Sequence, residues 1–240
     1  MNQVLRSNDP MGSAIYDYHK TGNADLLIVR STMFDDDCIP VENLFRDFKD
    51  MPELEQCALK KAKGRILDVG AGSGCHSLAL KEMGKDVVAI DISSLSVDVM
   101  KERGVDARCV NFYDENFTER FDTILMLMNG TGIVGRLENM PAFFARLDAM
   151  LTPGGSVLID SSDLRYLYED EDGTFEIDLA DEYYGLVDYQ MVYKNVTGKP
   201  FDWLYVDFET LAYYAEESGF KAEIIAEGEH YDYLAKLSKK

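Results

Sequence analysis

Three alternating glycines, Gly70, Gly72 and Gly74, follow a short apolar segment at 65–69 and precede a helical pattern at 75–83. Glycine lets the backbone turn sharply and approach a ligand without a Cβ atom in the way. The start of the helix directs its free N–H groups toward the same place. The spacing therefore predicts a strand, a tight turn and a helix that together hold a ligand.

A second apolar strand, predicted at 86–90, ends in Asp91. It lies about 20 residues after the first glycine, where doubly wound folds place a carboxylate that accepts hydrogen bonds from a ribose. The turn and the acid together indicate a nucleoside site. A nicotinamide dinucleotide is disfavoured, because its G-x-G-x-x-G motif needs glycine where Cys75 stands. In addition, the negative charge of Asp68 would be unfavourable beside a pyrophosphate but suits a ligand with an ammonium group.

Four segments have the order and spacing of a known set of motifs, and they cover 67–74, 89–93, 121–124 and 151–155. In order, they resemble the first motif, the second motif, the fourth-strand motif and the turn before strand five of the class I S-adenosylmethionine-dependent methyltransferases. The resemblance spans roughly 62–160 and resumes at 207–238. It implies an enzyme that binds S-adenosylmethionine and releases S-adenosylhomocysteine.

The resemblance, with the alternation of strands and helices from 62 onward, predicts an α/β fold. The expected sheet is doubly wound, Rossmann-like, seven-stranded and mostly parallel, with an antiparallel last strand. We expect the methyltransferase domain at 62–240, with an insertion at 161–206 that contains a small β-hairpin. Residues 1–61 are expected to form an N-terminal helical cap over the cofactor. The later core strands are expected at 106–111, 121–128, 156–160, 221–226 and 231–237.

The resemblance also implies where the cofactor is held. The turn amides and Asp68 suit its amino acid end, and Asp91 suits its ribose, with Ile92 against the adenine face. After the third strand the family commonly meets the adenine edge with an aspartate and the next backbone amide. This chain has Asn111 and the amide of Phe112 there, with Asp114 as an alternative contact. The full set expected around the cofactor is Asp68, Gly70, Ala71, Gly72, Gly74, His76, Asp91, Ile92, Asn111, Phe112 and Met128.

Methyl transfer from a sulfonium is an in-line displacement that needs alignment of the nucleophile, and a base only if the nucleophile arrives protonated. His19 has a pKa suited to that base and is the predicted catalytic residue, with a plain surface position as the alternative. Tyr16, Tyr18 and Asn129 are the predicted substrate contacts. Aromatic packing is the alternative for the tyrosines, and a simple turn is the alternative for Asn129.

Charge and composition exclude several classes of function. The net charge is −20, from 44 acidic and 24 basic side chains, so the chain would repel phosphate backbones and a nucleic acid partner is not expected. The four cysteines are scattered and form no C-x-x-C pair, so neither a metal site nor a disulfide is expected. No apolar run reaches membrane-spanning length and the start is no signal peptide, so a cytoplasmic protein is expected.

The sequence thus predicts a methyltransferase that acts on a small molecule. Three alternatives stay open: a methyltransferase of the same fold that acts on a protein, a protein that binds the cofactor without catalysis, and a nicotinamide oxidoreductase. No acceptor, methylated atom or oligomeric state is predicted.

Overall fold

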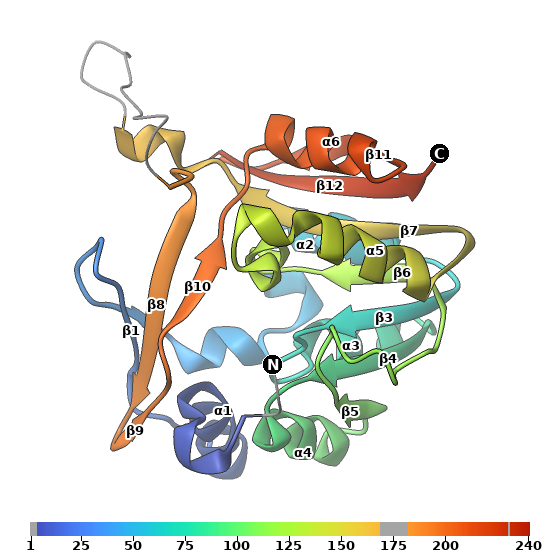
Figure 1. Cartoon of the computed structure of the whole chain (residues 1–240). Coiled ribbons are helices and arrows are strands. Elements are labelled where there is room, and N and C mark those ends of the chain that lie inside the picture. Colours follow the sequence, from blue (N-terminus) through green and yellow to red (C-terminus); the bar gives the residue numbers. More distant parts are fainter. Residues whose placement is uncertain (1–3, 169–181, 230) are drawn as a thin grey trace.

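The computed structural model describes residues 4–168, 182–229 and 231–240 (Figure 1). Its main sheet has seven strands in the order β11-β12-β7-β6-β3-β4-β5. Strand β12 is antiparallel to both of its neighbours, and the other pairs of adjacent strands are parallel. The bounds are β3 Arg65–Val69, β4 Asp86–Asp91, β5 Ala107–Cys109, β6 Phe121–Met126, β7 Leu151–Ser162, β11 Phe220–Glu227 and β12 Asp232–Lys239. This arrangement confirms the predicted fold class.

Helices cover both faces of the main sheet and bury its apolar side chains. On one face, α5 and α6 pack over alternate side chains of the central strands, including Leu67. On the other face, α2 and α3 pack over strand side chains that include Ile66, and α4 packs over Ala89. The helix bounds are α2 Glu53–Lys61, α3 Cys75–Glu82, α4 Ser94–Glu102, α5 Met140–Met150 and α6 Phe208–Glu217. Burial on both faces explains why the central strands are continuously apolar.

Side-chain caps set where several helices begin. The Ser93 side chain accepts a hydrogen bond from the Ser96 amide and caps the start of α4. Asp207 caps α6 in the same way through the Thr210 amide. Among the described residues, no helix has both the length and the apolar character needed to cross a bilayer.

A second sheet lies outside the methyltransferase-like core and has the order β10-β8-β1-β2, with β9 paired to β8. Strands β8 and β10 form the predicted hairpin. However, β1 and β2 come from the N-terminal segment, where only helices and loops were expected. That segment also contains helix α1 at Pro10–Thr21. The prediction for this segment was therefore incomplete, because β1 pairs with β8 across more than half of the chain. The bounds are β1 Leu27–Arg30, β2 Asp37–Ile39, β8 Leu186–Tyr193, β9 Val196–Thr197 and β10 Phe201–Leu204.

The second sheet lies beyond the carboxyl ends of β3, β6 and β7, toward which those strands point in Figure 1. Hydrogen bonds join it to the core. Thr131, in the turn after β6, donates to the carbonyl of Leu204 at 2.9 Å, and the Val206 amide donates to Ser161 at the end of β7 at 2.8 Å. The edge of a doubly wound sheet where ligands bind is therefore bordered by this second sheet.

Candidate cofactor and active site

The glycine turn between β3 and α3 has the left-handed backbone that its sequence predicts. Gly70, Gly72 and Gly74 have φ values of +69°, +56° and +82°. A Cβ atom added at Gly74 would lie 2.8 Å from the side chain of Met100, so this position also requires close packing. At Gly70, by contrast, an added Cβ would have no atom within 4 Å, so open space lies beside the start of the turn.

Four amides of this turn already donate hydrogen bonds to acceptors within the protein. Those of Gly70 and Ala71 donate to the Ile90 carbonyl at 2.9 and 3.2 Å, and that of Gly74 donates to the Ala71 carbonyl at 2.8 Å. The Gly72 amide donates to the Asp91 carboxylate at 2.9 Å. These four amides already have acceptors within the protein, and the expectation that amides of the turn receive the carboxylate of the ligand stays a prediction.

Asp91 links the turn to the N-terminal segment. Its second oxygen accepts from the Ser93 amide at 2.8 Å, and burial raises the pKa of Asp91 to about 6. The Ser93 hydroxyl donates to the buried Asp9 at 2.5 Å, and Asp9 caps α1 by accepting from the Gly12 amide. Ile92 is exposed beside this network, on the surface expected to meet adenine. The acid expected to bind ribose therefore also anchors the start of α1.

Asp68 is buried beneath the turn and accepts a hydrogen bond from the Ser77 hydroxyl at 2.6 Å. Burial raises the pKa of the Asp68 carboxyl, and the nearby His76 and the hydrogen bonds from Ser77 oppose that rise. One oxygen of Asp68 thus has a protein donor at the place where a ligand ammonium group is expected.

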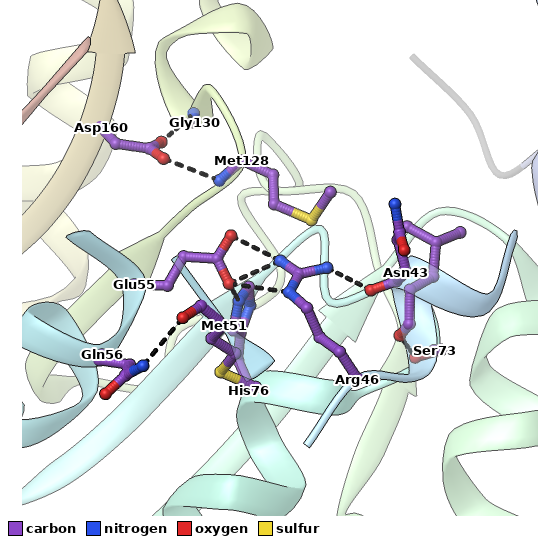
Figure 2. A network of polar contacts seen from close by, with 11 residues as sticks. Asn43, Arg46, Met51, Glu55, Gln56, Ser73, His76, Met128, Gly130 and Asp160 are labelled. Atoms are coloured by element: carbon purple, nitrogen blue, oxygen red, sulfur yellow. Dashed lines mark hydrogen bonds and ion pairs between the residues drawn. The ribbon is translucent and has the colours of Figure 1, made fainter. Parts of the chain in front are cut away.

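A buried ionic cluster of Arg46, Glu55 and His76 lies beside the glycine turn (Figure 2). Nε2 of His76 lies 2.8 Å from Oε2 of Glu55, and Nη2 of Arg46 lies 2.5 Å from the same carboxylate. Their side chains are only 6%, 7% and 11% exposed for His76, Glu55 and Arg46. Burial alone would raise the pKa of Glu55, but the hydrogen bonds and charges of His76 and Arg46 hold it below its ordinary value.

The turn after β6 has an unusual backbone. Met128 and Asn129 have φ values of +64° and +60°, in the left-handed region that residues with a Cβ atom rarely adopt. Asp160, near the end of β7, accepts from the Met128 amide at 3.0 Å and from the Gly130 amide at 2.8 Å (Figure 2). Burial raises the pKa of Asp160 to about 6, and the charge of Glu55 adds to that rise.

Sequence reasoning missed Arg46, Glu55 and Asp160 as site residues. For Asp160 a signal was present, because a carboxylate at the end of a predicted parallel strand lies at the ligand edge of the sheet. Arg46 and Glu55 lie in the N-terminal segment, where no motif marks them.

Comparison with known proteins identifies the family. A family model described as "Methyltransferase domain" matches residues 66–155. A solved structure of a S-adenosylmethionine-dependent methyltransferase from Bacteroides fragilis, in complex with S-adenosyl-L-homocysteine, is 60% identical. The two chains superpose with a TM-score of 0.94 over 99% of this chain and 98% of that one. This chain belongs to the class I S-adenosylmethionine-dependent methyltransferases. The predicted enzyme class and cofactor are thereby confirmed.

Other relatives of this methyltransferase match over shorter stretches. The Cypemycin N-terminal methyltransferase of a Streptomyces species is 34% identical over 102 residues, and a Ubiquinone biosynthesis O-methyltransferase of Bradyrhizobium sp. is 30% identical over 103 residues. These matches cover 41% and 40% of this chain, and they span only 42% and 39% of the two relatives. The CcbJ methyltransferase of Streptomyces caelestis, at 13% identity and a TM-score of 0.64, shares the fold over 98% of this chain and 99% of its own.

On the adenine side of this methyltransferase, the predicted contacts already serve the protein. The Asn111 side chain accepts from the Tyr113 amide at 2.8 Å. The Phe112 ring is buried in the core and its carbonyl accepts from Arg146 at 2.6 Å, while the contact of adenine with the Phe112 backbone amide stays a prediction. The alternative contact, Asp114, accepts from the Asn116 amide in a surface turn.

His19, the predicted general base, is paired with an acidic side chain. Its Nε2 lies 2.9 Å from the carboxylate of Glu102, the last residue of α4. His19 lies ten residues after Asp9, which is about 15 Å along the helix axis. Its partner Glu102 is 47% exposed, and the role of His19 as general base stays a prediction.

The two predicted tyrosine contacts on α1 pack within the N-terminal segment. The Tyr18 ring lies 4.7 Å from the ring of Phe45, and the ammonium group of Lys20 lies 5.2 Å above the ring of Tyr16. Both side chains are half-buried. These contacts correspond to the aromatic packing that was the alternative to substrate binding.

Proposed function

We propose that this methyltransferase transfers the methyl group of S-adenosylmethionine to a small molecule by in-line displacement. The observation that carries the proposal is the second sheet beyond the carboxyl ends of the core strands (Figure 1). It restricts the approach to the place where this fold binds its ligands, whereas an enzyme that acts on a protein surface needs an open groove.

Aromatic side chains of the second sheet and the segment after it support a small, flat or cationic acceptor. The hydroxyls of Tyr189, in β8, and Tyr205 lie 2.9 Å apart, and both side chains are half-buried. The negative charge of Asp160 contributes to raising the pKa of Tyr205, after burial and the contact with Tyr189. These tyrosines therefore lie near the ligand edge of the main sheet.

Two of the predicted contacts have a geometry that suits the cofactor. Open space beside Gly70 allows a ligand to approach the turn, and Asp91 lies at the end of β4 to receive ribose hydroxyls. We propose Arg46, whose guanidinium lies beside the turn and is paired with Glu55, as an additional positive group for the carboxylate of the methionine part. Its charge reaches the start of α3, where it opposes the rise in the pKa of the buried Cys75.

The chain's own residues would supply position and shielding. Bound S-adenosylmethionine supplies a methyl group on a positively charged sulfur. The protein must hold the nucleophile of the acceptor on the opposite side of that carbon and exclude water. Since the His19 ring is already paired with Glu102, we propose that the proton leaves through the acidity of the acceptor itself or through a carboxylate at the sheet edge.

The relatives do not select the methylated atom. One is named as a cypemycin N-terminal methyltransferase and the other as an O-methyltransferase, and each matches over only about 100 residues. The net charge of −20 disfavours a nucleic acid acceptor.

The proposal is tested with S-adenosylmethionine that carries a labelled methyl group. The enzyme is incubated with a cell extract that has been separated into small molecules and macromolecules, and an Asp91→Ala variant serves as the control for cofactor binding. We expect label in the small-molecule fraction, dependent on the wild-type enzyme. Label confined to proteins would contradict the small-molecule acceptor, and binding of S-adenosylhomocysteine without any label transfer would favour a non-catalytic binding protein.

A further inference from the structure

The loop at 110–117 follows β5 and lies at the ligand edge of the main sheet. Its first amide, that of Val110, donates to the carbonyl of Asp91 at 3.0 Å, and Asp91 ends the neighbouring strand β4. Ligands of doubly wound folds bind at this edge, beyond the carboxyl ends of the strands. A ribose bound at Asp91 would therefore have its base near the start of this loop.

The loop contains turns but no helix or strand, and one side chain of another element holds it. Arg146, on α5, donates from Nε to the Phe112 carbonyl at 2.6 Å. Its Nη2 group donates to the carbonyls of Asp114 and Phe117 at 2.9 and 2.8 Å. A guanidinium carries its donors in a rigid planar fork, and charge-assisted hydrogen bonds are about twice as strong as neutral ones. The loop backbone is therefore fixed to α5 at three points by a single group.

Packing and one further hydrogen bond also restrict the loop. Phe143 lies three residues before Arg146 on α5, which places both on one face of the helix. Its ring lies 5.8 Å from the buried ring of Phe112. The Tyr113 hydroxyl donates to the Ile133 carbonyl at 3.4 Å, in the turn that follows β6. The loop is thus attached both to α5 and to a second segment at the carboxyl edge of the sheet.

Recognition of a base needs such support. The edge of adenine presents an acceptor at N1 and an amine at position 6, so a protein must hold a donor and an acceptor at matching positions. Binding groups of this kind have to be kept within about 0.5 Å of the productive geometry by the residues around them. A loop without a helix or strand needs contacts from outside to meet that requirement.

We infer that Arg146 is a positioning residue that holds the 110–117 loop in the form in which it binds the adenine edge of the cofactor. Arg146 acts through the loop backbone, since its three hydrogen bonds go to loop carbonyls. The inference rests on the proposed function only in placing the ribose at Asp91.

The test compares S-adenosylhomocysteine with S-inosylhomocysteine, in which a carbonyl replaces the amine at position 6 and N1 carries a hydrogen. Both polarities at the base edge are thereby reversed, while the ribose and the amino acid part are unchanged. A site that pairs with the edge rejects the reversed base by about tenfold for each mispaired group. We expect calorimetry of the wild-type enzyme to show a preference for S-adenosylhomocysteine of at least about thirtyfold.

Arg146→Lys keeps the charge and the apolar stem, but an ammonium group cannot reproduce the planar fork that holds three carbonyls. We expect the preference to fall at least about threefold, which is part of the value of one hydrogen bond. Arg120→Lys is the matched control, because Arg120 donates to the carbonyl of Leu151 at 3.3 Å, at the start of β7, and it should keep the wild-type preference. Asp91→Ala removes the ribose contact that both nucleosides share, so it should weaken both to the same extent.

The ratio of the two affinities separates positioning from a general effect on stability. Thermal unfolding without ligand shows whether each variant is folded, and Arg146→Gln gives the same comparison if Arg146→Lys is not. A folded variant of Arg146 that keeps the wild-type preference overturns the inference, and so does a wild-type enzyme that binds both nucleosides equally.

Hydrogen exchange of the wild-type enzyme decides the case in which neither variant folds. Slower exchange of the 110–117 amides with S-adenosylhomocysteine than with S-inosylhomocysteine, both at saturation, supports the inference, and equal exchange overturns it. None of these measurements uses a methyl acceptor, so failure of the small-molecule proposal would leave them intact. An Asp91→Ala variant with wild-type affinity for both nucleosides would count against the ribose placement instead.

Discussion

Replacing Glu55 with glutamine should strongly destabilise the fold. Glu55 lies between Arg46 and His76, and all three side chains are about nine-tenths buried or more. Removing one partner of a buried ion pair leaves the other charge uncompensated and typically costs about 3–5 kcal/mol. In a chain of 240 residues, each kcal/mol shifts the thermal midpoint by about 2–4 °C. We therefore expect the midpoint of Glu55→Gln to fall by about 6–20 °C.

The chain offers a matched control for this substitution. Glu102 also contacts a histidine and a cation, His19 and Lys20, but its side chain is 47% exposed. Solvent screens ion pairs in such a setting, so they contribute little to stability. Glu102→Gln should therefore shift the midpoint by less than about 4 °C in the same thermal scan.

The dependence on pH gives a second, independent check. The pKa of Glu55 in the folded protein lies below its ordinary value of 4.5. The stability that its charge contributes is therefore fully present above the pKa of the unfolded chain and is lost as the pH falls through the folded value. The gap between wild type and Glu55→Gln should be large at pH 7 and should shrink below about pH 4. A midpoint equal to that of Glu102→Gln at pH 7 would refute the reasoning.

Three further outcomes are expected. An ionised carboxylate is the best acceptor for hydrogen bonds from ribose hydroxyls, and burial raises the pKa of Asp91 to about 6. The affinity for S-adenosylhomocysteine measured by calorimetry should therefore fall as the pH drops through about 6. Affinity that stays constant between about pH 5 and 8 would count against ribose binding by Asp91. The stability of the fold should not fall over this range through Asp91, because a raised carboxyl pKa favours the protonated folded state. An added Cβ at Gly132 would lie 1.9 Å from the ring of Trp203, so Gly132→Ala should displace β10 and lower the thermal midpoint by several degrees. His19→Ala should leave the rate of label transfer within about twofold of wild type. A loss of that rate of about a hundredfold would support His19 as the general base.

The core of the fold could be predicted because its signals are local. The predicted strand at 65–69 coincides with β3, and the glycines that follow it have the positive φ values that their spacing implies. Asp91 lies at the end of the neighbouring strand and contacts the turn, as its register with the glycines suggests. Each of these features is encoded within about 20 residues, which is the range that motif spacing can report.

The remainder depends on contacts between distant parts of the chain. Leu27 pairs with Tyr193 in the second sheet, and no periodicity within four residues of β1 could indicate that partner. The end of β6 was predicted at 128 but lies at Met126, because Asp160 draws the next residues into a left-handed turn. Such an interaction joins two strands whose adjacency has to be known before the role of the carboxylate can be recognised.

The two histidine–glutamate contacts show why residue type and neighbourhood were insufficient to place the chemistry. His19 and His76 each contact a glutamate at 2.9 and 2.8 Å, and each glutamate also contacts a cation. One cluster joins the exposed ends of α1 and α4, where solvent screens its charges. The other is enclosed beside the glycine turn, where electrostatic interactions are stronger and a bound ligand would meet them directly. Burial therefore decides which histidine can influence methyl transfer. The burial of His76 follows from the packing of α2 against α3, and the sequence around either histidine does not reveal that packing.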